Sequence, residues 1–413
     1  PIAYLADVMG LGKTAQLIRA CDLVQAERVT VVCPAILLEN WRREYGRFSY
    51  VGLPVMLLRT GKDKVPAGPS VVIVSDALVH SDKVRKQLLD RAGDVLIIDE
   101  AHRVKDRRAQ RTKATLGKWG LCHKVEHTWL SSGTPALNHA GEMYPFCVAA
   151  GLWKGPYDAP VGSFVLEYCE TVRTQYGLKI LGNRNADKLR ALMAPVLLRR
   201  TLDDVPLDLP ELLEPQTLYV QGDAKLLQDI EPETLEAIEH ARLTGDWSLR
   251  ETPAIATARR IIGAAKAGAV ADLAKLELDA GLDRLLIFGI HRSFFDVLAR
   301  ELAAYGVGLL NGDTPKPERE RLVNDFQNPA GTTRILLCQI TVAGAGLNLT
   351  AASRVMMGEW AWTPAENDQA IARSHRRGQT RPVRVSYVSI AGSVDGRVST
   401  AEGDKRKRLL ELY

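Results

Sequence analysis

Few cysteines and no long hydrophobic run occur in this sequence of 413 residues. Its six cysteines are scattered and form no C-x-x-C pair, which argues against a disulfide scaffold and favours a reducing, intracellular compartment. Cys122, His123 and His127 lie close together, but a fourth ligand for a structural zinc ion is missing. No apolar run approaches the ~20 residues of a membrane-spanning helix. No signal peptide is visible, although the chain opens on the strand-like PIAYLA rather than on a methionine.

A large excess of one charge is also missing. Lysine and arginine number 54 against 49 aspartates and glutamates, a balance that permits nucleic-acid binding without predicting it. Hydrophobic residues make up 46% and charged residues 25%, as in an ordinary globular protein. Because the chain is longer than one hydrophobic core usually spans, we expect two domains.

Short β-rich runs alternate with helical patterns in the first part of the chain. The expected strands are YLAD, VTVVCP, VGLPVMLL, SVVIVS, DVLIIDE and HTWLSSGTP. Strands that alternate with helices indicate a parallel, doubly wound α/β sheet. From about 140 to 280 helical periodicity dominates, and β/α alternation resumes at RLLIFG, residues 284–289.

This order of expected strands and helices predicts two α/β lobes with helical segments between them. The proline-rich VPLDLPELLEP, residues 205–215, is expected to be an extended linker. The first lobe is expected at 1–204 and includes a helical protrusion at about 139–200. The second lobe is expected at 205–413 and includes a helical insertion at about 222–280 and a terminal helix at about 399–413.

The run DVMGLGKT, residues 7–14, has the chemistry of a phosphate-binding loop although Asp7 replaces the first glycine of the usual pattern. Glycines allow backbone N–H groups to fold around phosphate oxygens, the lysine supplies a positive charge, and the threonine hydroxyl suits Mg²⁺. A chance glycine-rich turn is the alternative. The expected nucleotide-binding residues are Met9, Gly10, Leu11, Gly12, Lys13 and Thr14.

A buried strand ends in two acids in LIIDEAH, residues 96–102. In phosphate-loop enzymes an acid at this place holds Mg²⁺, so we expect Asp99 to bind the metal together with Thr14. Glu100 is then placed to orient or deprotonate a water molecule. The loop and the acid pair together predict a bound nucleoside triphosphate with Mg²⁺.

These two motifs together resemble those of the Swi/Snf-type ATPases of helicase superfamily 2. Further blocks occur in the family's order, namely VVCPAILLENWRREYGRF, LSSGTPALN, APVLLRRT, LLIFG, TVAGAGLNLTAASRV and WTPAENDQAIARSHRRGQT. The resemblance covers nearly the whole chain and implies two RecA-like lobes, each a mostly parallel sheet flanked by helices. GTPA and GAAKAGAV are similar to the annealing-helicase-like branch, and the alanine- and arginine-rich style is typical of bacteria or phages.

In QAIARSHRRGQ, Arg373 and Arg376 are three residues apart, a spacing that places them on one face of a helix. The resemblance implies that both arginines reach the γ-phosphate at the cleft between the lobes, a role worth ~10³–10⁵ in rate in other NTPases. It also implies coupling roles for Gln369 and His375 and a nucleotide contact for Gly346. A basic surface helix is the alternative.

The resemblance further implies double-stranded DNA as the partner, held through its phosphates rather than its base edges. The candidate contacts by position are Pro34, Ser75, Gly133, Thr134, Asn311, Gly312, Gly344 and Asn348, each of which is otherwise an ordinary loop residue. Trp360 is a candidate for stacking on DNA, with a buried core position as the alternative.

The predicted function is a monomeric, intracellular, DNA-stimulated ATPase that uses ATP and Mg²⁺ to move along DNA or remodel protein–DNA complexes. It would act in the cytoplasm or nucleoid of a bacterium, or in a nucleus. A strand-separating DNA or RNA helicase, an ATP-gated binding scaffold and an unrelated phosphate-loop transporter or kinase are the alternatives. The sequence departs from the family at Val8, Ala372 and Thr363, none of which is an expected phosphate or metal ligand.

Overall fold

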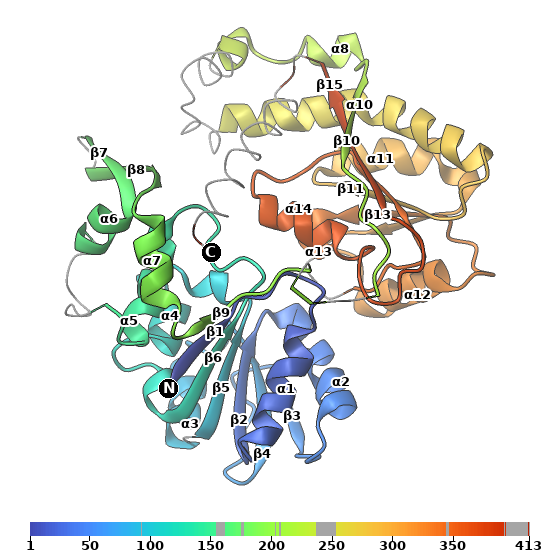
Figure 1. The fold of residues 1–413 in the computed structure, drawn as a ribbon. Coiled ribbons are helices and arrows are strands. Elements are labelled where there is room, and N and C mark those ends of the chain that lie inside the picture. The colour runs from blue at the N-terminus through green and yellow to red at the C-terminus, as the bar shows by residue number, and fades with distance from the viewer. Residues whose placement is uncertain are drawn as a thin grey trace. The chain divides into compact units, whose positions relative to one another are not determined.

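The chain divides into two compact units, which are described separately (Figure 1). The first comprises Pro1–Leu207 and Lys405–Tyr413, and the second comprises Asp208–Asp404, so the division falls after residue 207 where the sequence predicted 204. This computed structural model describes residues 1–91, 93–153, 162–174, 177–202, 204–205, 208–236, 253–343, 347–391, 393 and 412.

A seven-stranded, all-parallel sheet forms the centre of the first unit. Its strands follow the order β3 (Val55–Leu58), β4 (Ser70–Ser75), β2 (Arg28–Cys33), β5 (Gly93–Asp99), β6 (Val125–Ser131), β1 (Ile2–Leu5) and β9 (Leu197–Leu198). The central strands β2, β4 and β5 are short runs rich in β-branched residues and are buried on both faces, as strands of parallel sheets usually are. The expected doubly wound sheet is therefore confirmed. The expected loop motifs of this unit follow the carboxyl ends of these strands, where α/β sheets bind ligands.

Alternate residues of each strand enter two separate hydrophobic cores. Val95 and Ile97 of β5 face the core with α1 (Lys13–Leu23) and α2 (Leu38–Phe48). Leu96 and Ile98 face the opposite core, which contains α3 (Asp82–Arg91) and α4 (Gln110–Thr115). This alternation follows from the two-residue period of a strand, and helices cover both faces of the sheet. Short 3-10 turns also occur at η1 (Ala35–Leu37), η2 (Ala101–Val104), η3 (Leu121–His123) and η4 (Ala140–Met143).

The expected helical protrusion at about 139–200 is only partly helical. It contains α5 (Tyr144–Ala149), α6 (Gly162–Tyr168) and α7 (Ala186–Met193), but also an antiparallel hairpin of β7 (Cys169–Thr174) and β8 (Gly177–Asn183). This hairpin is a separate two-stranded sheet (Figure 1). The expected helical protrusion is therefore met by three helices, and the hairpin between them was not predicted.

The second unit is also built on a parallel sheet, here with six strands. The order is β10 (Gln216–Val220), β15 (Arg384–Ile390), β14 (Arg354–Met357), β11 (Leu285–Gly289), β13 (Ile335–Gln339) and β12 (Val307–Leu310). The sequence did not predict β10, which lies at the edge of the sheet directly after the proline-rich segment. Two RecA-like sheets flanked by helices are thus confirmed.

Helices cover both faces of this second sheet. The long helix α10 (Pro253–Asp279) contributes its first half to one core and its second half to the other. The remaining helices are α8 (Ala224–Leu227), α11 (Arg292–Glu301), η6 (Ala303–Tyr305), α12 (Lys316–Gln327), α13 (Ile340–Ala343) and α14 (Pro364–Ile371). Within the described part of the chain, no helix combines the length and apolar character needed to cross a bilayer.

Parts of two expected helical regions lie outside the described residues. Within the insertion expected at about 222–280, residues 237–252 are not described. The terminal helix expected at about 399–413 also lies outside them, except for Leu412. That leucine is fully buried in the core of the first unit, although the sequence assigned its segment to the second lobe.

Candidate nucleotide site

The loop that follows β1 has the backbone shape of an anion site. Gly10 and Gly12 have φ angles of 92° and 75°, in the left-handed region where a side chain would be strained. Helix α1 begins directly after Gly12, and no side chain caps its first turn. The N–H groups of that turn therefore lack partners within the helix and can bind phosphate oxygens.

Lys13 lies beside the acid pair at the end of β5. Its Nζ donates hydrogen bonds to the carbonyl oxygens of Asp7, at 2.8 Å, and Val8, at 3.2 Å. Burial lowers the pKa of Lys13, while the negative charges of Glu100 and Asp99 oppose that shift. The ammonium group is thus held by its own loop and faces two carboxylates, as a lysine poised for a phosphate should be.

Gly133, a residue expected at DNA, packs against the nucleotide loop instead. A Cβ atom at this position would lie 3.0 Å from Met9 Cγ and 3.5 Å from Lys13 Nζ. The close approach explains the glycine in the SSGTP run after β6. The structure therefore gives Gly133 a role in shaping the nucleotide loop.

Two side chains from other strands and helices fix the carboxylate of Asp99. Trp41 Nε1 in α2 donates to Oδ2 at 2.8 Å, and the Ser131 hydroxyl at the end of β6 donates to Oδ1 at 2.8 Å. Burial raises the pKa of Asp99 and neighbouring Glu100 raises it further, whereas these two hydrogen bonds lower it. The carboxylate is thereby held in one orientation at the carboxyl edge of the sheet.

The donor set fits magnesium better than a transition metal. Asp99 and the half-buried Thr14 offer hard oxygen ligands. Among the described residues, no three His, Cys, Asp or Glu side chains form a group able to hold a metal ion. Mg²⁺ matches such a sparse site because it is bound through one or two protein oxygens together with substrate phosphates and water.

Glu100 adopts a strained backbone conformation next to Asp99, the acid that was expected to bind the metal. Its φ and ψ angles are both 49°, and only two other non-glycine residues in the described ranges have a positive φ. His102 Nδ1 lies 3.3 Å from Glu100 Oε2 and 3.0 Å from Ser132 Oγ. Burial lowers the pKa of His102 to about 4, so the imidazole is neutral at pH 7. Strain of this kind concentrates at functional sites, where the surroundings hold it in place.

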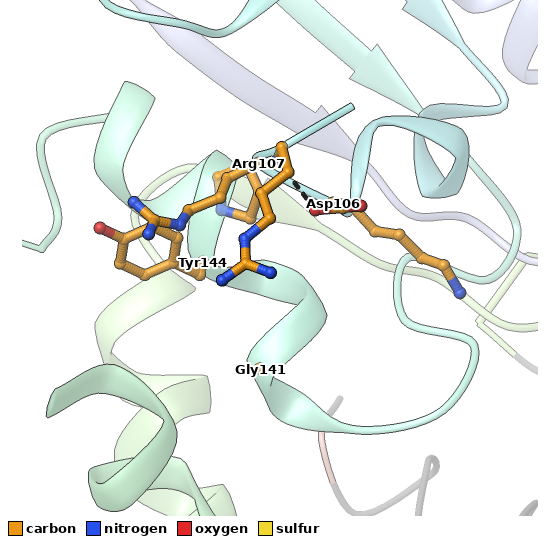
Figure 2. Close-up of a pocket in the computed structure, with 7 residues that line it drawn as sticks. Asp106, Arg107, Gly141 and Tyr144 are labelled. Atoms are coloured by element: carbon orange, nitrogen blue, oxygen red, sulfur yellow. Dashed lines mark hydrogen bonds between the residues drawn. The ribbon is translucent and has the colours of Figure 1, made fainter. Parts of the chain in front are cut away.

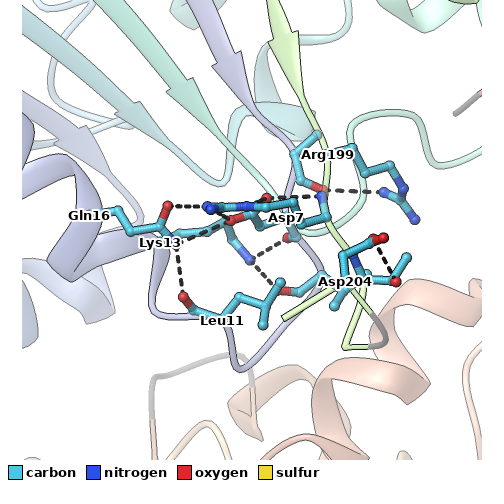
Figure 3. Close-up of polar contacts among 10 residues, drawn as sticks. Asp7, Leu11, Lys13, Gln16, Arg199 and Asp204 are labelled. Atoms are coloured by element: carbon cyan, nitrogen blue, oxygen red, sulfur yellow. Dashed lines mark hydrogen bonds and ion pairs between the residues drawn. The ribbon is translucent and has the colours of Figure 1, made fainter. Parts of the chain in front are cut away.

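Asp7, which replaces the first glycine of the usual loop pattern, is the centre of a buried polar network (Figure 3). Its side chain is 0% exposed. Oδ1 accepts from the Arg200 backbone N–H at 3.0 Å and from Arg200 Nε at 3.2 Å, while Oδ2 accepts from Nη2 at 2.5 Å. Gln16 Nε2 donates to Asp7 Oδ2 at 3.1 Å and to the Leu11 carbonyl at 2.8 Å. Asp7 therefore joins the loop, α1 and the end of β9.

The other expected DNA contacts in the first unit lie at the same edge of the sheet. Pro34 precedes η1 after β2 and is partly exposed. Ser75 ends β4, is 7% exposed, and accepts a hydrogen bond from the Leu78 N–H at 3.2 Å. The Thr134 hydroxyl is buried, and its backbone N–H donates to Ser132 Oγ at 3.2 Å. Pro34 and Thr134 are both partly exposed, whereas Ser75 and the Thr134 hydroxyl are buried.

In the second unit, the expected shared helical face for the arginine pair is wrong. Helix α14 ends at Ile371, and Arg373 and Arg376 lie in the turns that follow. Tertiary bonds stop the helix: the Arg373 carbonyl accepts from the Leu349 N–H at 2.9 Å, and Ser374 Oγ donates to the Ala352 carbonyl at 2.5 Å. A turn that is tied to residues 347–352 replaces the helical spacing.

The neighbours of the arginine pair are held in the same turn. Arg376 Nη1 donates to the Leu347 carbonyl at 3.0 Å, and His375 Nε2 pairs with the Pro210 carbonyl at 2.8 Å. Gln369 is half-buried in the last part of α14. These contacts fix the backbone of the segment and leave its chemical role as a prediction.

The remaining candidates of the second unit divide into three groups. Asn311 caps the turn after β12 by accepting from the N–H groups of Asp313 and Thr314, both at 3.0 Å, and Gly312 N–H donates to Gln339 Oε1 at 3.1 Å. Asn348 is exposed. Gly344 and Gly346 lie outside the described residues.

Trp360 does not fit the stacking role that was expected for it. The side chain is 1% exposed, its ring packs edge-on against Tyr387 at 5.3 Å, and Lys266 Nζ lies 4.7 Å from its centre. No face of the indole is left for a base. The alternative of a buried core position is correct.

Sequence reasoning missed Trp41, Ser131 and Arg200 as parts of the site. Each lies in a sequence block that resembles a family motif, but the residues around it do not show which group it binds. Their partners lie 58, 32 and 193 residues away in the chain. Only the fold shows what they hold.

A separate hollow in the first unit is lined by basic side chains (Figure 2). Arg107 approaches Tyr144 there, and Asp106 is the one acid of the lining. The lining residues are Lys105, Asp106, Arg107, Arg108, Gly141, Tyr144 and Pro145. The hollow shares no residue with the nucleotide site, and its charge favours an anion.

Comparison with known families agrees with this geometry. The model of the SNF2-related domain matches residues 3–224, and that of the helicase conserved C-terminal domain matches residues 268–378. The chain belongs to the SNF2-related family. The resemblance to Swi/Snf-type ATPases is thereby confirmed, and the chain is an ATPase core of helicase superfamily 2.

Several curated proteins are similar over 95% of this chain. The SWI/SNF-related matrix-associated actin-dependent regulator of chromatin subfamily A-like protein 1 homolog of Caenorhabditis elegans is 29% identical over 411 residues, which are 56% of its length. The Bos taurus protein of that name is 28% identical, with 41% of its length covered. The human DNA annealing helicase and endonuclease ZRANB3 is 28% identical, with 37% covered. The chain thus spans about half or less of these relatives.

One solved structure is similar in outline. The Sulfolobus solfataricus SWI2/SNF2 ATPase core in complex with double-stranded DNA aligns with a TM-score of 0.43 and 22% identity, covering 98% of this chain and 87% of that one.

Proposed function

We propose that this chain is the motor core of a DNA translocase, which hydrolyses ATP with Mg²⁺ when double-stranded DNA is bound. The observation that carries the proposal is the grouping of three features at one sheet edge. These are the loop with left-handed Gly10 and Gly12, Lys13 on the first turn of α1, and the acid pair Asp99–Glu100 that influences the lysine charge.

Each group of the first unit has a role that its contacts support. The N–H groups around Gly12 and the charge of Lys13 hold the ATP phosphates. Asp99, oriented by Trp41 and Ser131, and Thr14 hold the metal, which supplies charge neutralisation at the phosphates when bound.

Glu100 orients and deprotonates the attacking water. Its strained backbone and its neighbour His102, neutral at pH 7, keep the carboxylate at the end of β5. Because the imidazole is neutral, His102 adds no positive charge beside the Glu100 carboxylate and does not lower its basicity.

The arginine pair is proposed on the strength of its motif. Arg373 and Arg376 stabilise the charge that develops on the γ-phosphate, and Gln369 couples their turn to the nucleotide state. The assignment rests on the match of residues 268–378 to the helicase C-terminal domain. Gly346 is proposed as a further nucleotide contact on the same basis.

For DNA we propose phosphate contacts by Pro34, Asn311, Gly312, Gly344 and Asn348, with the basic hollow at Arg107 and Arg108 as an added electrostatic contact. Trp360 and Gly133 are not part of this set. The names of the relatives, which include a DNA annealing helicase, support DNA as the partner. We also propose that the core acts as a monomer inside the cell, where its six free cysteines stay reduced.

Steady-state ATP hydrolysis tests the proposal. Turnover is measured without nucleic acid, with duplex DNA, with single-stranded DNA and with duplex RNA. We expect strong stimulation by duplex DNA that is lost in Lys13→Ala and in Glu100→Gln, while Glu100→Gln still binds ATP. Absence of turnover under every condition contradicts the proposal and favours an ATP-gated scaffold, whereas stimulation by RNA with strand displacement favours a helicase.

A further inference from the structure

A buried carboxylate lies at the carboxyl edge of the second sheet. Glu359 follows β14 and is 4% exposed. Its Oε2 accepts from the N–H groups of Ile290 and His291, at 2.7 Å and 2.8 Å, and its Oε1 pairs with His291 Nδ1 at 2.7 Å. Burial raises the pKa of Glu359, but the interactions with His291 and Ile290 together outweigh burial and hold the pKa below its ordinary value. The charged carboxylate therefore fixes the loop between β11 and α11.

Helix α10 closes the other side of this carboxylate. A Cβ atom at Gly263 would lie 2.1 Å from Glu359 Oε1, so a larger residue at this position must displace the carboxylate from its hydrogen bonds. Glycine is unfavourable in the interior of a helix compared with alanine. The close approach of Glu359 explains why α10 carries a glycine here.

One side chain joins the fixed loop to the turn after β12. Gln339 is the last residue of β13, which lies between β11 and β12 in the sheet. Its Nε2 donates to the Ile290 carbonyl at 3.1 Å, and its Oε1 accepts from the Gly312 N–H at 3.1 Å. The Glu359 carboxylate is thus connected to the turn through the backbone of Ile290 and the amide of Gln339.

The turn presents the side-chain amide of Asn311 in one orientation. Oδ1 accepts from the Thr314 hydroxyl and from the N–H groups of Asp313 and Thr314, all at 3.0 Å. Three donors on one atom identify it as the amide oxygen. Asn311 is partly exposed, and its Nδ2 bonds to none of the described residues. This NH₂ group is therefore a fixed donor that suits an acceptor such as a phosphate oxygen.

We propose that Asn311 Nδ2 donates to a DNA phosphate and that Gln339 and Glu359 are positioning residues for this contact. Glu359 holds the loop at Ile290, and Gln339 transmits that position to the turn at Gly312. Neither positioning residue touches DNA itself. This inference rests on the proposed function and adds to it the residues that set the geometry of one phosphate contact.

The first test measures the Kd of the whole chain for duplex DNA by fluorescence anisotropy at several salt concentrations. The variant is Gln339→Met, which removes both hydrogen bonds of the bridge. The matched control is Gln87→Met, because Gln87 is likewise half-buried and bridges the Val65 N–H, at 3.0 Å, and the Asp63 carbonyl, at 3.4 Å.

We expect Gln339→Met to raise the Kd about tenfold at every salt concentration and the control to leave it unchanged. The salt slope should stay the same, because a neutral amide releases no counterion from DNA. An unchanged Kd overturns the positioning role of Gln339. A shallower salt slope also overturns it, because it indicates that a cationic contact was lost instead.

A double-mutant cycle separates positioning from a general structural role. Asn311→Ala should raise the Kd by a similar factor, and in its presence Gln339→Met should add less than a further twofold. Multiplication of the two losses overturns the inference, because Gln339 would then affect DNA binding through some group other than Asn311.

The role of Glu359 is tested from the opposite side, since removal of a buried carboxylate could prevent folding. Gly263→Ala displaces the carboxylate, whereas Gly268→Ala in the same helix places its Cβ atom within 4 Å of no described neighbour. We expect the Kd to rise about threefold or more in the first variant only. Equal Kd values for the two overturn the role of Glu359. These measurements need no ATP, so a parent that binds DNA without DNA-stimulated hydrolysis refutes the motor function, while a loss in Gln339→Met that depends on Asn311 still supports the positioning role.

Discussion

The substitution Arg200→Ala tests whether the Asp7 network holds the nucleotide loop. It removes two side-chain donors from a carboxylate that is 0% exposed, leaving the Arg200 backbone N–H and Gln16 as its remaining partners. Removal of one partner of a buried ion pair costs about 3–5 kcal/mol. Because the guanidinium itself is 35% exposed, we expect the lower end of this range, about 3 kcal/mol.

A loss of this size is measurable as a shift of the unfolding transition. For a unit of about 200 residues, each kcal/mol of lost unfolding free energy lowers the melting temperature by about 2–4 °C. The first unit of the variant should therefore melt roughly 6–12 °C lower than in the parent. Differential scanning calorimetry of the whole chain follows this transition. The control is Arg199→Ala, whose Nη1 donates to the Ala6 carbonyl at 3.3 Å and for which we expect a loss of about 1 kcal/mol or less.

A double-mutant cycle gives the decisive result. Asp7→Asn keeps the shape of the side chain and removes its charge, so in its presence Arg200→Ala should cost much less than in the parent. We expect a coupling free energy of at least about 1 kcal/mol between the two positions. Additive effects, or equal losses for Arg199→Ala and Arg200→Ala, would refute the reasoning that the pair stabilises the loop.

Two further predictions concern the nucleotide site, and a third concerns the basic hollow. Trp41→Phe removes one hydrogen bond from Asp99 and should raise the Mg²⁺ concentration for half-maximal turnover about 10–100-fold. The control Tyr45→Phe, which loses a hydrogen bond to Cys21 Sγ, should leave this concentration unchanged. The pKa of His102 is about 4 in the folded protein and 6.5 in the unfolded chain, so between these pH values the unfolded chain binds a proton that the folded protein does not. The free energy of unfolding should therefore fall by about 3 kcal/mol as the pH drops from 6.5 to 4. Urea titrations across this range should show that loss in the parent and not in His102→Asn. Arg108→Glu should raise the duplex DNA concentration for half-maximal ATPase stimulation and flatten its dependence on salt; an unchanged salt slope contradicts the assignment of the hollow.

The strands and the site motifs could be predicted because their signals are local. A strand such as VLII is buried on both faces, so it is uniformly apolar, and DVMGLGKT carries its glycines, lysine and threonine within one turn. Interactions between motifs leave no such local signal. The hydrogen bond from Trp41 to Asp99 and the ion pair of Asp7 with Arg200 join residues that only the order of the strands brings together.

The errors have the same physical origin. The spacing of Arg373 and Arg376 predicted a helix, but hydrogen bonds to residues 347–352 end the helix before the first arginine. The helical periodicity of the segments around 139–200 predicts a helical protrusion, but β7 and β8 form a hairpin within it. In both places tertiary contacts override a weak local preference, as they commonly do.

Asp7 shows how a departure from the usual loop pattern is accommodated. A glycine at this position would supply backbone freedom, but here Gly10 and Gly12 already occupy the left-handed conformations of the loop. The position is therefore free to carry a side chain, and its carboxylate accepts from the backbone and guanidinium of Arg200 at the end of β9. Arg200 also bonds Gln16, which in turn bonds the Leu11 carbonyl inside the loop. A displacement of the segment that follows β9 must consequently act on the loop that we propose to hold ATP, through Arg200 and Asp7, to which we assign no catalytic chemistry.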